Sequence, residues 1–395
     1  MSRMAPTDQQ RVMMIAPTPY FSDRGCHVRI FEEAQGLMAA GHQVRVVTYP
    51  LGRDVDPVPV VRTIAVPWYT KHGAGPSWHK PYLDLLLCLR ALREVRHFRP
   101  TVIHAHLHEG ALIGWVIARL SGVPLLFDYQ GSLSGELLHH GSYRRGGVLH
   151  RCFRRLEQCI NGLATMVVTS STAGAAEVRE GSPRQSVVSL PDGVDTKRFM
   201  PGDRLAARQE LAIPDNRPVA VFIGLMNQYQ GVDLLLEAVQ HIRRAGHPLF
   251  TIIMGFPDHP YQAMADRYGI RDAVRFTGRV DYQHVSRLLA AGDIAVAPKI
   301  ATTEANGKIL NYMACGLPVV AFDTPVNREL LGDDGIYVPL GDARQLAAAM
   351  MALADQPDHS ALLGKQMRQR AVEQLSWQCR ISELLNCYTR VQERR

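Results

Sequence analysis

Residues 298–323, PKIATTEANGKILNYMACGLPVVAFD, decide the fold class of this chain. With the apolar residues just before them they predict a buried strand, a polar loop, a helix that ends at Gly316, and a second strand at 317–322. Strand, loop, helix and strand in so short a span make a βαβ unit, and such units build parallel sheets. Ligands of these sheets bind at the carboxyl ends of the strands, where loops meet helix N-termini. The loop 299–308 occupies that position.

This loop carries groups that suit a phosphate and a sugar. Lys299 and Lys308 supply positive charge, and Glu304 is its only carboxylate. Gly307 lets the backbone approach an anion closely, and Asn306 adds an amide. We predict that the two lysines bind phosphate and that Glu304 contacts a sugar hydroxyl. The alternative is a set of solvated loop residues with no ligand.

Composition places the chain among ordinary globular proteins. Its 395 residues are 46% hydrophobic and 21% charged, and two domains are expected at this length. No apolar run is long enough to span a bilayer, and the start, MSRMAPTDQQR, lacks the apolar core of a signal peptide. The seven cysteines include no C-x-x-C pair. We therefore expect a cytoplasmic protein with neither a disulfide framework nor a zinc site.

The net charge of +7 is unevenly distributed. Residues 1–190 contain 21 Lys and Arg against 14 Asp and Glu, whereas residues 191–395 contain 23 of each. The N-terminal half therefore suits an anionic partner, and an ordinary solvated basic surface is the alternative. Five arginines cluster in the predicted helix 143–159, and Trp68, Tyr69 and Trp78 lie in the variable segment 51–80. We expect an anionic membrane surface, at the cytoplasmic face, rather than nucleic acid.

Hydrophobic periodicity predicts two series of alternating strands and helices. In the first series, strands are predicted at 11–17, 44–48, 102–106, 123–128, 165–169 and 187–190, with helices at 26–40, 80–98, 111–120 and 143–159. In the second, strands are predicted at 219–223, 250–254, 274–276, 294–297 and 317–322, with helices at 231–245, 261–268, 285–291 and 308–315. The fold class is thus α/β, with two doubly wound Rossmann-like domains that face a cleft.

The turn-rich run 190–201 interrupts this periodicity and predicts the domain boundary. We assign residues 1–192 to an N-terminal domain and residues 193–375 to a C-terminal domain. Residues 376–395 are expected to form a final helix that packs back on the N-terminal domain. The dinucleotide fingerprint G-x-G-x-x-G is absent from the first strand–helix unit. Gly25 at the start of its helix, flanked by Arg24 and Arg29, still suits an anion.

Several segments resemble, in the right order, the retaining glycosyltransferases of family 4, which have the GT-B fold. LPDGVDTKRFMP at 190–201 is similar to the family's linker signature, and FIGLMNQYQGVDLLLEAV at 222–239 to the start of its nucleotide-binding domain. RFTGRVDYQHVSRLLAAGDIAVAP at 275–298 resembles the segment that receives the nucleobase. MACGLPVVAFD at 313–323 and GIYVPLGDARQLAAAM at 335–350 are the most specific.

The resemblance implies transfer of a sugar from a nucleotide diphosphate to a glycan or lipid-linked acceptor with retained configuration. The donor would bind the second domain and the acceptor mainly the first. The resemblance implies no cofactor and no metal, because protein cations and helix N-termini carry the diphosphate charge. The departing phosphate would itself take the acceptor's proton.

Candidate site residues follow from these motifs and from the loops at strand ends. The predicted catalytic residues are Glu304, Asp128 and Lys308. Donor contacts are predicted at Gly25, Arg24, Arg29, Gly224, Asn227, Gln230, Gly231, Arg279, Val280, Lys299, Asn306, Gly307, Ile309 and Asn311. Acceptor contacts are predicted at Asp23, His106, His108, Glu109 and Gln130.

The sequence departs from the family pattern at several of these positions. Leu225 and Gln230 stand where the family has an arginine and a lysine that grip the diphosphate, and Asn311 replaces the second of two glutamates. The first glutamate falls nominally on Thr303, one residue before Glu304. The Tyr-Gln-Gly run at 229–231 predicts a distinct subgroup. A catalytically impaired sugar-nucleotide-binding protein and a nucleotide-sugar 2-epimerase are the alternatives to a transferase.

Three histidines invite a metal interpretation. His104, His106 and His108 alternate, so on one strand all three would share a face. No cysteine or aspartate cluster accompanies them, and the run HAHLHEG resembles the family's His-x-His-x-Glu strand end. We therefore expect one of them, or Glu109, to face the cleft rather than to bind a metal.

Overall fold

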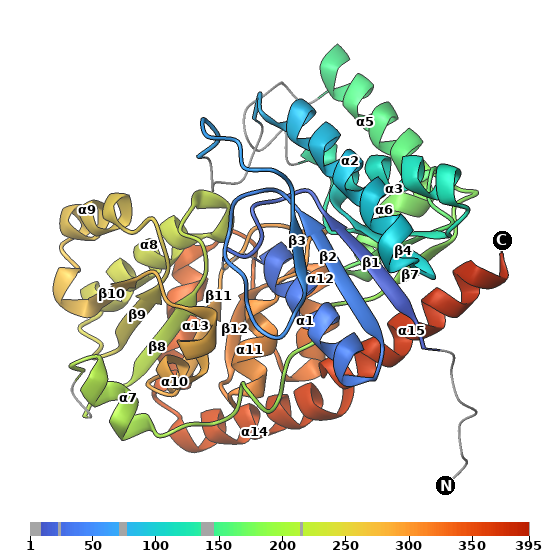
Figure 1. Cartoon of the computed structure of the whole chain (residues 1–395). Helices are drawn as coiled ribbons and strands as arrows, with labels where there is room; N and C mark the ends of the chain where they lie inside the picture. The colour runs from blue at the N-terminus through green and yellow to red at the C-terminus, as the bar shows by residue number, and fades with distance from the viewer. Residues whose placement is uncertain (1–8, 23–24, 71–76, 136–145, 214–215, 395) are drawn as a thin grey trace, which may run out of the picture. The chain divides into compact units, whose positions relative to one another are not determined.

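The computed structural model describes residues 9–22, 25–70, 77–135, 146–213 and 216–394 (Figure 1). The chain divides into two compact units, Met1–Pro191 with Arg380–Arg395, and Asp192–Cys379. Each unit is built around one parallel sheet. The predicted α/β class with two doubly wound Rossmann-like domains is confirmed.

The N-terminal unit holds a seven-stranded sheet in the order β3-β2-β1-β4-β5-β6-β7. Every pair of neighbouring strands is parallel; for example, Met13 of β1 pairs with Arg45 of β2 and Ile103 of β4. The strands are β1 (Arg11–Ala16), β2 (Gln43–Thr48), β3 (Val60–Arg62), β4 (Val102–His106), β5 (Leu125–Tyr129), β6 (Met166–Thr169) and β7 (Val187–Ser189).

Helices cover both faces of this sheet. They are α1 (Gly25–Ala39), α2 (Lys80–Phe98), α3 (Leu107–Ser121), α5 (Val148–Asn161), α6 (Thr172–Gly181) and α15 (Trp377–Glu393). A buried apolar cluster joins α2, α3, α5 and α6 to one face, through residues such as Leu87, Ile117 and Phe127. On α1, a Cβ at Gly36 would lie 2.5 Å from Ile381 of α15, so these two helices pack closely.

The C-terminal unit holds a six-stranded parallel sheet in the order β10-β9-β8-β11-β12-β13. Its strands are β8 (Val219–Ile223), β9 (Phe250–Met254), β10 (Val274–Gly278), β11 (Ile294–Ala297), β12 (Val319–Phe322) and β13 (Ile336–Val338). Its α-helices are α7 (Arg204–Glu210), α8 (Val232–Arg244), α9 (His259–Tyr268), α10 (Val285–Leu289), α11 (Lys308–Ala314), α12 (Pro325–Leu331), α13 (Ala343–Ala354) and α14 (Pro357–Gln374). Short 3-10 turns η1 (Gln228–Gln230), η2 (Arg271–Ala273), η3 (Tyr282–His284) and η4 (Gly332–Asp334) complete it.

Two predicted boundaries differ in ways that affect the site. Helix α3 begins at Leu107 rather than Ala111, so His108 and Glu109 lie in its first turn and not on a strand. Helix α5 begins at Val148. Residues 143–145, the start of the predicted helix, lie outside the part of the chain that the structure describes. Strands β3 and β13 and helices α6, α7, α12, α13 and α14 were not predicted. β3 is only three residues long, too short for a period-2 pattern to be visible.

Candidate functional site

The strand order creates a switch point in the C-terminal unit. Strands β8 and β11 are neighbours. After β8 the following strands, β9 and β10, add to one side of the sheet, and after β11 the strands β12 and β13 add to the other side. Open α/β sheets bind ligands at the carboxyl ends of the strands beside such a switch point, so the loops after β8 and β11 form the candidate ligand site, which we call the crevice. The loop after β8 runs through η1 to Gly231, and the loop after β11 runs from Pro298 to Gly307.

Three glycines let the backbones of these loops meet. Gly231 has φ +71°, and a Cβ there would lie 1.9 Å from the carbonyl oxygen of Pro298. A Cβ at Gly255 would lie equally close to the Gly224 carbonyl oxygen. Any side chain at these two positions would force the loops apart. Gly224 itself has φ +154°, and a Cβ on it would stand 3.0 Å from Lys308 Nζ, so the lysine ammonium lies directly over the end of β8.

Lys308 is the first residue of α11 and points back toward β8. Its Nζ donates a 2.6 Å hydrogen bond to Gln230 Oε1 and lies 4.2 Å from the centre of the Phe222 ring. Burial lowers the pKa of the Lys308 ammonium well below its usual value, and the charge of Lys299 lowers it further. An anion beside this ammonium would reverse both effects. The geometry thus favours a negatively charged ligand at Lys308.

Lys299 lies in the same loop and is 6% exposed. Its Nζ donates to the Ala305 carbonyl oxygen at 2.8 Å, lies 3.4 Å from Glu304 Oε2, and sits 5.2 Å from the Tyr229 ring centre. Burial lowers the pKa of Lys299, and the charges of Glu304 and Asp192 partly oppose that shift. Glu304 is therefore tied to Lys299, which orients its carboxylate within the loop.

Two residues predicted as donor contacts, Asn306 and Ile309, are buried. Asn306 is 3% exposed, and its amide nitrogen donates to Asn327 Oδ1 at 3.0 Å, so it holds the loop against α12. The side chain of Ile309 is fully buried in the core. Neither side chain is placed to touch a ligand in the crevice.

The remaining predicted donor residues of this unit lie at the crevice or on more distant strands. Asn227 Oδ1 accepts a 2.9 Å hydrogen bond from Gln230 N and so shapes the turn that carries Gln230. Arg279 and Val280 follow β10, which is two strands away from β8, and Arg279 stacks on Phe256 at 5.1 Å. Asn311 is half-buried on α11, one turn beyond Lys308.

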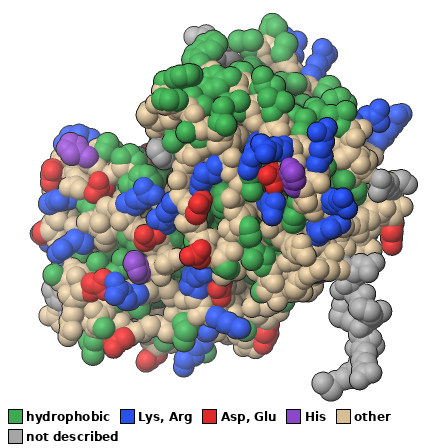
Figure 2. Space-filling model, viewed as in Figure 1, with side chains coloured by type: hydrophobic (Ala, Val, Ile, Leu, Met, Phe, Trp, Pro, Cys, Tyr) green, Lys and Arg blue, Asp and Glu red, His purple; other side chains and the backbone are tan. Residues whose placement is uncertain are grey.

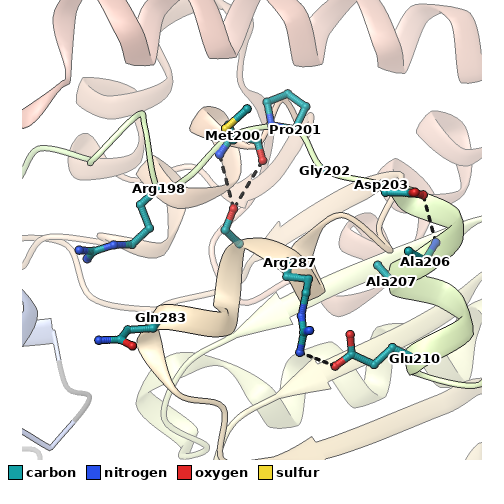
Figure 3. Close-up of a pocket in the computed structure, with 11 residues that line it drawn as sticks. Arg198, Met200, Pro201, Gly202, Asp203, Ala206, Ala207, Glu210, Gln283 and Arg287 are labelled. Atoms are coloured by element: carbon teal, nitrogen blue, oxygen red, sulfur yellow. Dashed lines mark hydrogen bonds and ion pairs between the residues drawn. The ribbon is translucent and has the colours of Figure 1, made fainter.

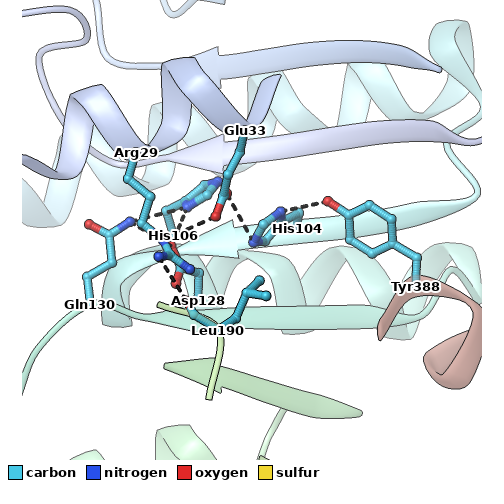
Figure 4. Close-up of polar contacts among 8 residues, drawn as sticks. All are labelled: Arg29, Glu33, His104, His106, Asp128, Gln130, Leu190 and Tyr388. Atoms are coloured by element: carbon cyan, nitrogen blue, oxygen red, sulfur yellow. Dashed lines mark hydrogen bonds and ion pairs between the residues drawn. The ribbon is translucent and has the colours of Figure 1, made fainter. Parts of the chain in front are cut away.

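Asp128, predicted as a catalytic residue, is fully buried inside the N-terminal unit (Figure 4). Its Oδ2 lies 3.0 Å from Arg29 Nε, 2.9 Å from His106 Nδ1 and 2.7 Å from Gln130 Nε2. Burial alone would raise the pKa of Asp128, but the Arg29 charge and the His106 hydrogen bond outweigh it and lower the pKa. Protein groups therefore hold Asp128 Oδ2, and a substrate contact of this carboxylate stays a prediction.

The same network contains Arg29 and His106, which were predicted as donor and acceptor contacts. Arg29 is 3% exposed, and its guanidinium bonds to Asp128, Glu33 and the Leu190 carbonyl oxygen. His106 is fully buried beside His104, with ring centres 4.3 Å apart, and burial lowers its pKa. Gln130 remains partly exposed at the edge of this network.

His108 lies apart from the other two histidines. Its ring packs 5.4 Å from Phe127 and 5.3 Å from Tyr129, both in the apolar cluster on the opposite face of the sheet. Its Nε2 lies 3.6 Å from Glu157, and its side chain is buried, so it too is removed from an acceptor. Glu109 forms an ion pair with Lys80 of α2 and is half-buried.

Residues at the start of α1 complete the predicted set. Asp23 and Arg24 lie outside the described residues. Gly25 begins α1, and a Cβ there would meet no atom within 4 Å, so the position leaves open space.

A surface groove elsewhere in the C-terminal unit shares no residue with the crevice (Figure 3). It runs between α7 and α10 beside the segment 198–203, and Arg287 bonds Glu210 across it at 2.8 Å. Its lining holds exposed ion pairs and capping residues, and we assign it no chemistry.

Sequence reasoning missed three carboxylates that organise these sites. Glu33 lies one turn after Arg29 on α1, on the buried face, and that spacing was the available signal. Asp192 lies near Gly307, where a Cβ would stand 3.5 Å from its Oδ2. Glu157 of α5 accepts hydrogen bonds from Tyr129 Oη and from the Leu133 and Ser134 amides, which fixes the loop after β5. No local pattern indicated either of the last two.

Two family models match the chain, and between them they cover most of it. Residues 24–193 match the glycosyl transferase 4-like domain, and residues 217–356 match the glycosyl transferases group 1 domain. The fold and the cationic crevice define a two-domain GT-B protein. The chain is thus similar to one glycosyltransferase domain in each of its two units.

Relatives and solved structures agree with this assignment. The D-inositol 3-phosphate glycosyltransferases of Geodermatophilus obscurus and Thermobispora bispora are 27% and 26% identical, over 93% and 94% of this chain and 85% and 90% of their own. Sucrose-phosphate synthase from Thermosynechococcus elongatus superposes with a TM-score of 0.82 at 19% identity, covering 98% of this chain and 100% of its own. Anabaena HepE in complex with UDP and glucose gives 0.79 at 16% identity, over 96% and 100%. These structures support the fold.

Proposed function

We propose that this protein is a retaining glycosyltransferase of the hexosyltransferase type. It would transfer a sugar from a nucleoside-diphosphate donor to a glycan or lipid-linked acceptor. The observation that carries this proposal is the pair of lysines at the β8–β11 switch point, in the domain that matches the glycosyl transferases group 1 model. Lys308 has a neutral partner in Gln230, so the site holds positive charge that a diphosphate would match.

Gln230 explains how the crevice could work without the family's usual cations. The Tyr-Gln-Gly run places the Gln230 carbonyl 2.6 Å from Lys308 Nζ and Tyr229 beside Lys299. We infer that this loop orients the two lysines instead of adding a charge of its own. Proteins that share it would form a subgroup with this arrangement.

The retaining mechanism is consistent with the burial of Asp128. An inverting enzyme needs a base in contact with the acceptor hydroxyl, and the aspartate predicted nearest to that role is enclosed by Arg29, His106 and Gln130. In the retaining route the departing phosphate takes the acceptor proton, and Glu304 holds the sugar. Lys299 and Lys308 would neutralise the developing phosphate charge, so transfer would need no divalent metal.

A screen of nucleotide sugars followed by product analysis tests the proposal. A bound donor should raise the melting temperature in proportion to its affinity, and incubation with water or an acceptor panel should release the nucleotide. The panel should include D-inositol 3-phosphate, since the relatives bear that name. Binding without nucleotide release would indicate the impaired binding protein, and a sugar altered at C2 would indicate the epimerase. If chelation stops transfer and Mg²⁺ or Mn²⁺ restores it, the metal-independent route is wrong.

A further inference from the structure

Two imidazole nitrogens in the core of the N-terminal unit have no hydrogen-bond partner. Among the described residues, Nε2 of His104 and Nε2 of His106 are both buried and unpaired. Buried polar atoms are almost always satisfied, so each exception needs an explanation. The two residues alternate on β4, which sends both side chains to the same face of the sheet. Their ring centres lie 4.3 Å apart.

The other nitrogen of each ring is already held. Nδ1 of His104 lies 2.9 Å from Tyr388 Oη, and Nδ1 of His106 lies 2.9 Å from Asp128 Oδ2 (Figure 4). This is the arrangement of histidines that bind metals, in which an outer hydrogen bond to a carboxylate or hydroxyl orients the ring and leaves the second nitrogen for the ion.

A carboxylate from helix α1 adds a third possible metal ligand to the two histidines. Glu33 of α1 places Oε2 3.9 Å from His104 Nε2, while its Oε1 lies 3.1 Å from Arg29 Nε. Ligand atoms of Glu33, His104, His106 and Asp128 all lie within 4.8 Å of one another, and all four residues are buried. A transition metal with ligand bonds of about 2.0–2.2 Å would draw these atoms together by small side-chain adjustments.

The charges of the cluster favour a cation. Glu33 and Asp128 carry two negative charges against the single guanidinium of Arg29, because the imidazoles are neutral when they act as ligands. We propose that Glu33, His104 and His106 form a structural site for a divalent transition metal of the Zn²⁺ class. Arg29, Asp128 and Tyr388 act as positioning residues around it. Two imidazoles with one carboxylate suit zinc and its neighbours rather than Mg²⁺ or Ca²⁺.

Such a metal would stabilise the fold and take no part in sugar transfer. Its ligands come from β4 and α1, and Tyr388 adds α15, so the ion would join three elements that are far apart in the sequence. Because all the ligands are buried, the ion would be taken up as the chain folds. The inference is independent of the proposed transferase activity.

Metal content of the full-length protein tests this site directly. The chain is expressed in medium supplemented with Zn²⁺, and in parallel with Co²⁺, and bound metal is measured by mass spectrometry after gel filtration. We expect about one equivalent per chain and, for Co²⁺, the visible absorption of a site with nitrogen and oxygen ligands. Removing the metal with a chelator during unfolding and refolding should lower the melting temperature, and Zn²⁺ should restore it.

Matched variants separate the site from general damage to the fold. Glu33→Gln and His104→Gln should bind at least tenfold less metal, whereas His108→Gln, which alters a buried histidine on the opposite face of the sheet, should keep a full equivalent. Tyr388→Phe should weaken Zn²⁺ affinity by about 10- to 100-fold, as is usual for an outer hydrogen bond. Less than about a tenth of an equivalent in the wild-type protein, with a melting temperature indifferent to Zn²⁺, would overturn the proposal. So would a loss of metal in His108→Gln equal to that in His104→Gln.

Discussion

Lys308 carries the strongest expectation for a single residue. Removing its ammonium should lower kcat/KM at least tenfold, because the charge that stabilises the departing diphosphate is lost. Tenfold corresponds to about 1.4 kcal/mol of transition-state stabilisation. The measurement is steady-state transfer by Lys308→Ala with the donor found in the screen. Lys365→Ala, which removes an exposed lysine from α14, is the matched control and should leave the kinetics unchanged. Wild-type kinetics in Lys308→Ala would contradict the assignment.

The titration of Lys308 gives a second, independent expectation. Burial lowers the pKa of this lysine in the unliganded protein, and an anion beside it should raise that pKa again. Nucleoside-diphosphate binding should therefore take up protons at a pH above the lowered value, and affinity should fall as pH rises further. Calorimetry of UDP binding in two buffers of different ionisation enthalpy measures the uptake.

The control for this linkage is a cation that does not titrate. Lys308→Arg keeps the positive charge, but a guanidinium holds its proton throughout the accessible range. Binding by this variant should show no proton uptake associated with position 308. Equal uptake in the wild type and in Lys308→Arg would assign the proton to another group.

Individual site residues were predictable where the backbone decides their position. Lys299, Glu304 and Lys308 lie at the carboxyl end of a strand that the apolar pattern locates, so their place in the crevice follows from chain order. The pairing of Arg29 with Asp128 was not predicted, because it depends on a contact between α1 and β5, 99 residues apart. A charged residue next to a predicted loop looks the same in sequence whether it faces solvent or a buried partner.

Helix α2 carries a half-buried carboxyl whose ionisation should destabilise the fold. Asp84 accepts a short hydrogen bond from Tyr49 Oη, and burial raises its pKa to about 6. Because the folded pKa lies above the unfolded value, Asp84 contributes stability at low pH and loses it as pH rises through about 6. Asp84→Asn keeps an acceptor for Tyr49 and removes the charge.

We therefore expect Asp84→Asn to be more stable than the wild type by about 1–2 kcal/mol at pH 8, and by only about a third of that difference at pH 4.5. Thermal unfolding of the N-terminal unit, followed by calorimetry at both pH values, measures the difference. A variant that is less stable than the wild type at pH 8 would show that the carboxylate is instead favourable in its ionised form. Asp358→Asn, on the exposed start of α14, should show neither effect.

Elements were predictable in proportion to their length and burial. Strands β4, β8, β9 and β11 and helix α2 were located to the residue, because long apolar stripes or continuous apolar runs separate them from polar loops. Helix α3 was started four residues late, because its first turn, Leu107 to Gly110, contains two buried residues that look like a continuing strand. Strand β3 forms only because β2 offers it an edge, and no local signal reports that.

The exposed surface of the N-terminal unit carries the residues on which the predicted association with a membrane depends. Helix α5 exposes Arg151, Arg154 and Arg155 beside Val148 and Leu149. Large apolar side chains gather over this helix and its neighbours in the view of Figure 2. The exposed large apolar side chains of the N-terminal unit include Trp68, Trp78, Leu85, Leu89, Leu112 and Trp115. Tyr69, predicted as an interfacial aromatic, is buried in the core, and Arg144 and Arg145 lie outside the described residues.

We therefore expect this face to bind anionic lipid, with the apolar side chains in the interface and each basic residue near the surface adding about 1 kcal/mol. None of the helices in the described residues is long and apolar enough to cross a bilayer. Flotation with phosphatidylserine or phosphatidylglycerol vesicles should succeed at low salt and weaken as salt rises. Replacing Arg151, Arg154 and Arg155 by Gln should abolish it.

The matched control neutralises three exposed arginines of the other unit, Arg243, Arg244 and Arg267. This triple variant has the same net charge as the α5 variant and should float like the wild type. If both triple variants float equally poorly, the attraction depends on overall charge and not on α5. If the wild type remains at the bottom of the gradient with anionic vesicles at low salt, the membrane proposal is wrong and the transferase proposal stands unaffected.

The return of α15 to the N-terminal unit reverses the usual order of folding during synthesis. Tyr388 bonds to His104 across 284 residues, and Gln392 bonds to Gln10 across 382. The N-terminal unit therefore lacks its last helix until residues 380–395 have been synthesised, and the apolar face of α1 that Ile381 covers stays open meanwhile. The second domain is one uninterrupted stretch of chain, Asp192–Cys379, and can close while synthesis continues. A nascent chain stalled before residue 380 should accordingly expose a protease-sensitive first domain beside a resistant second one.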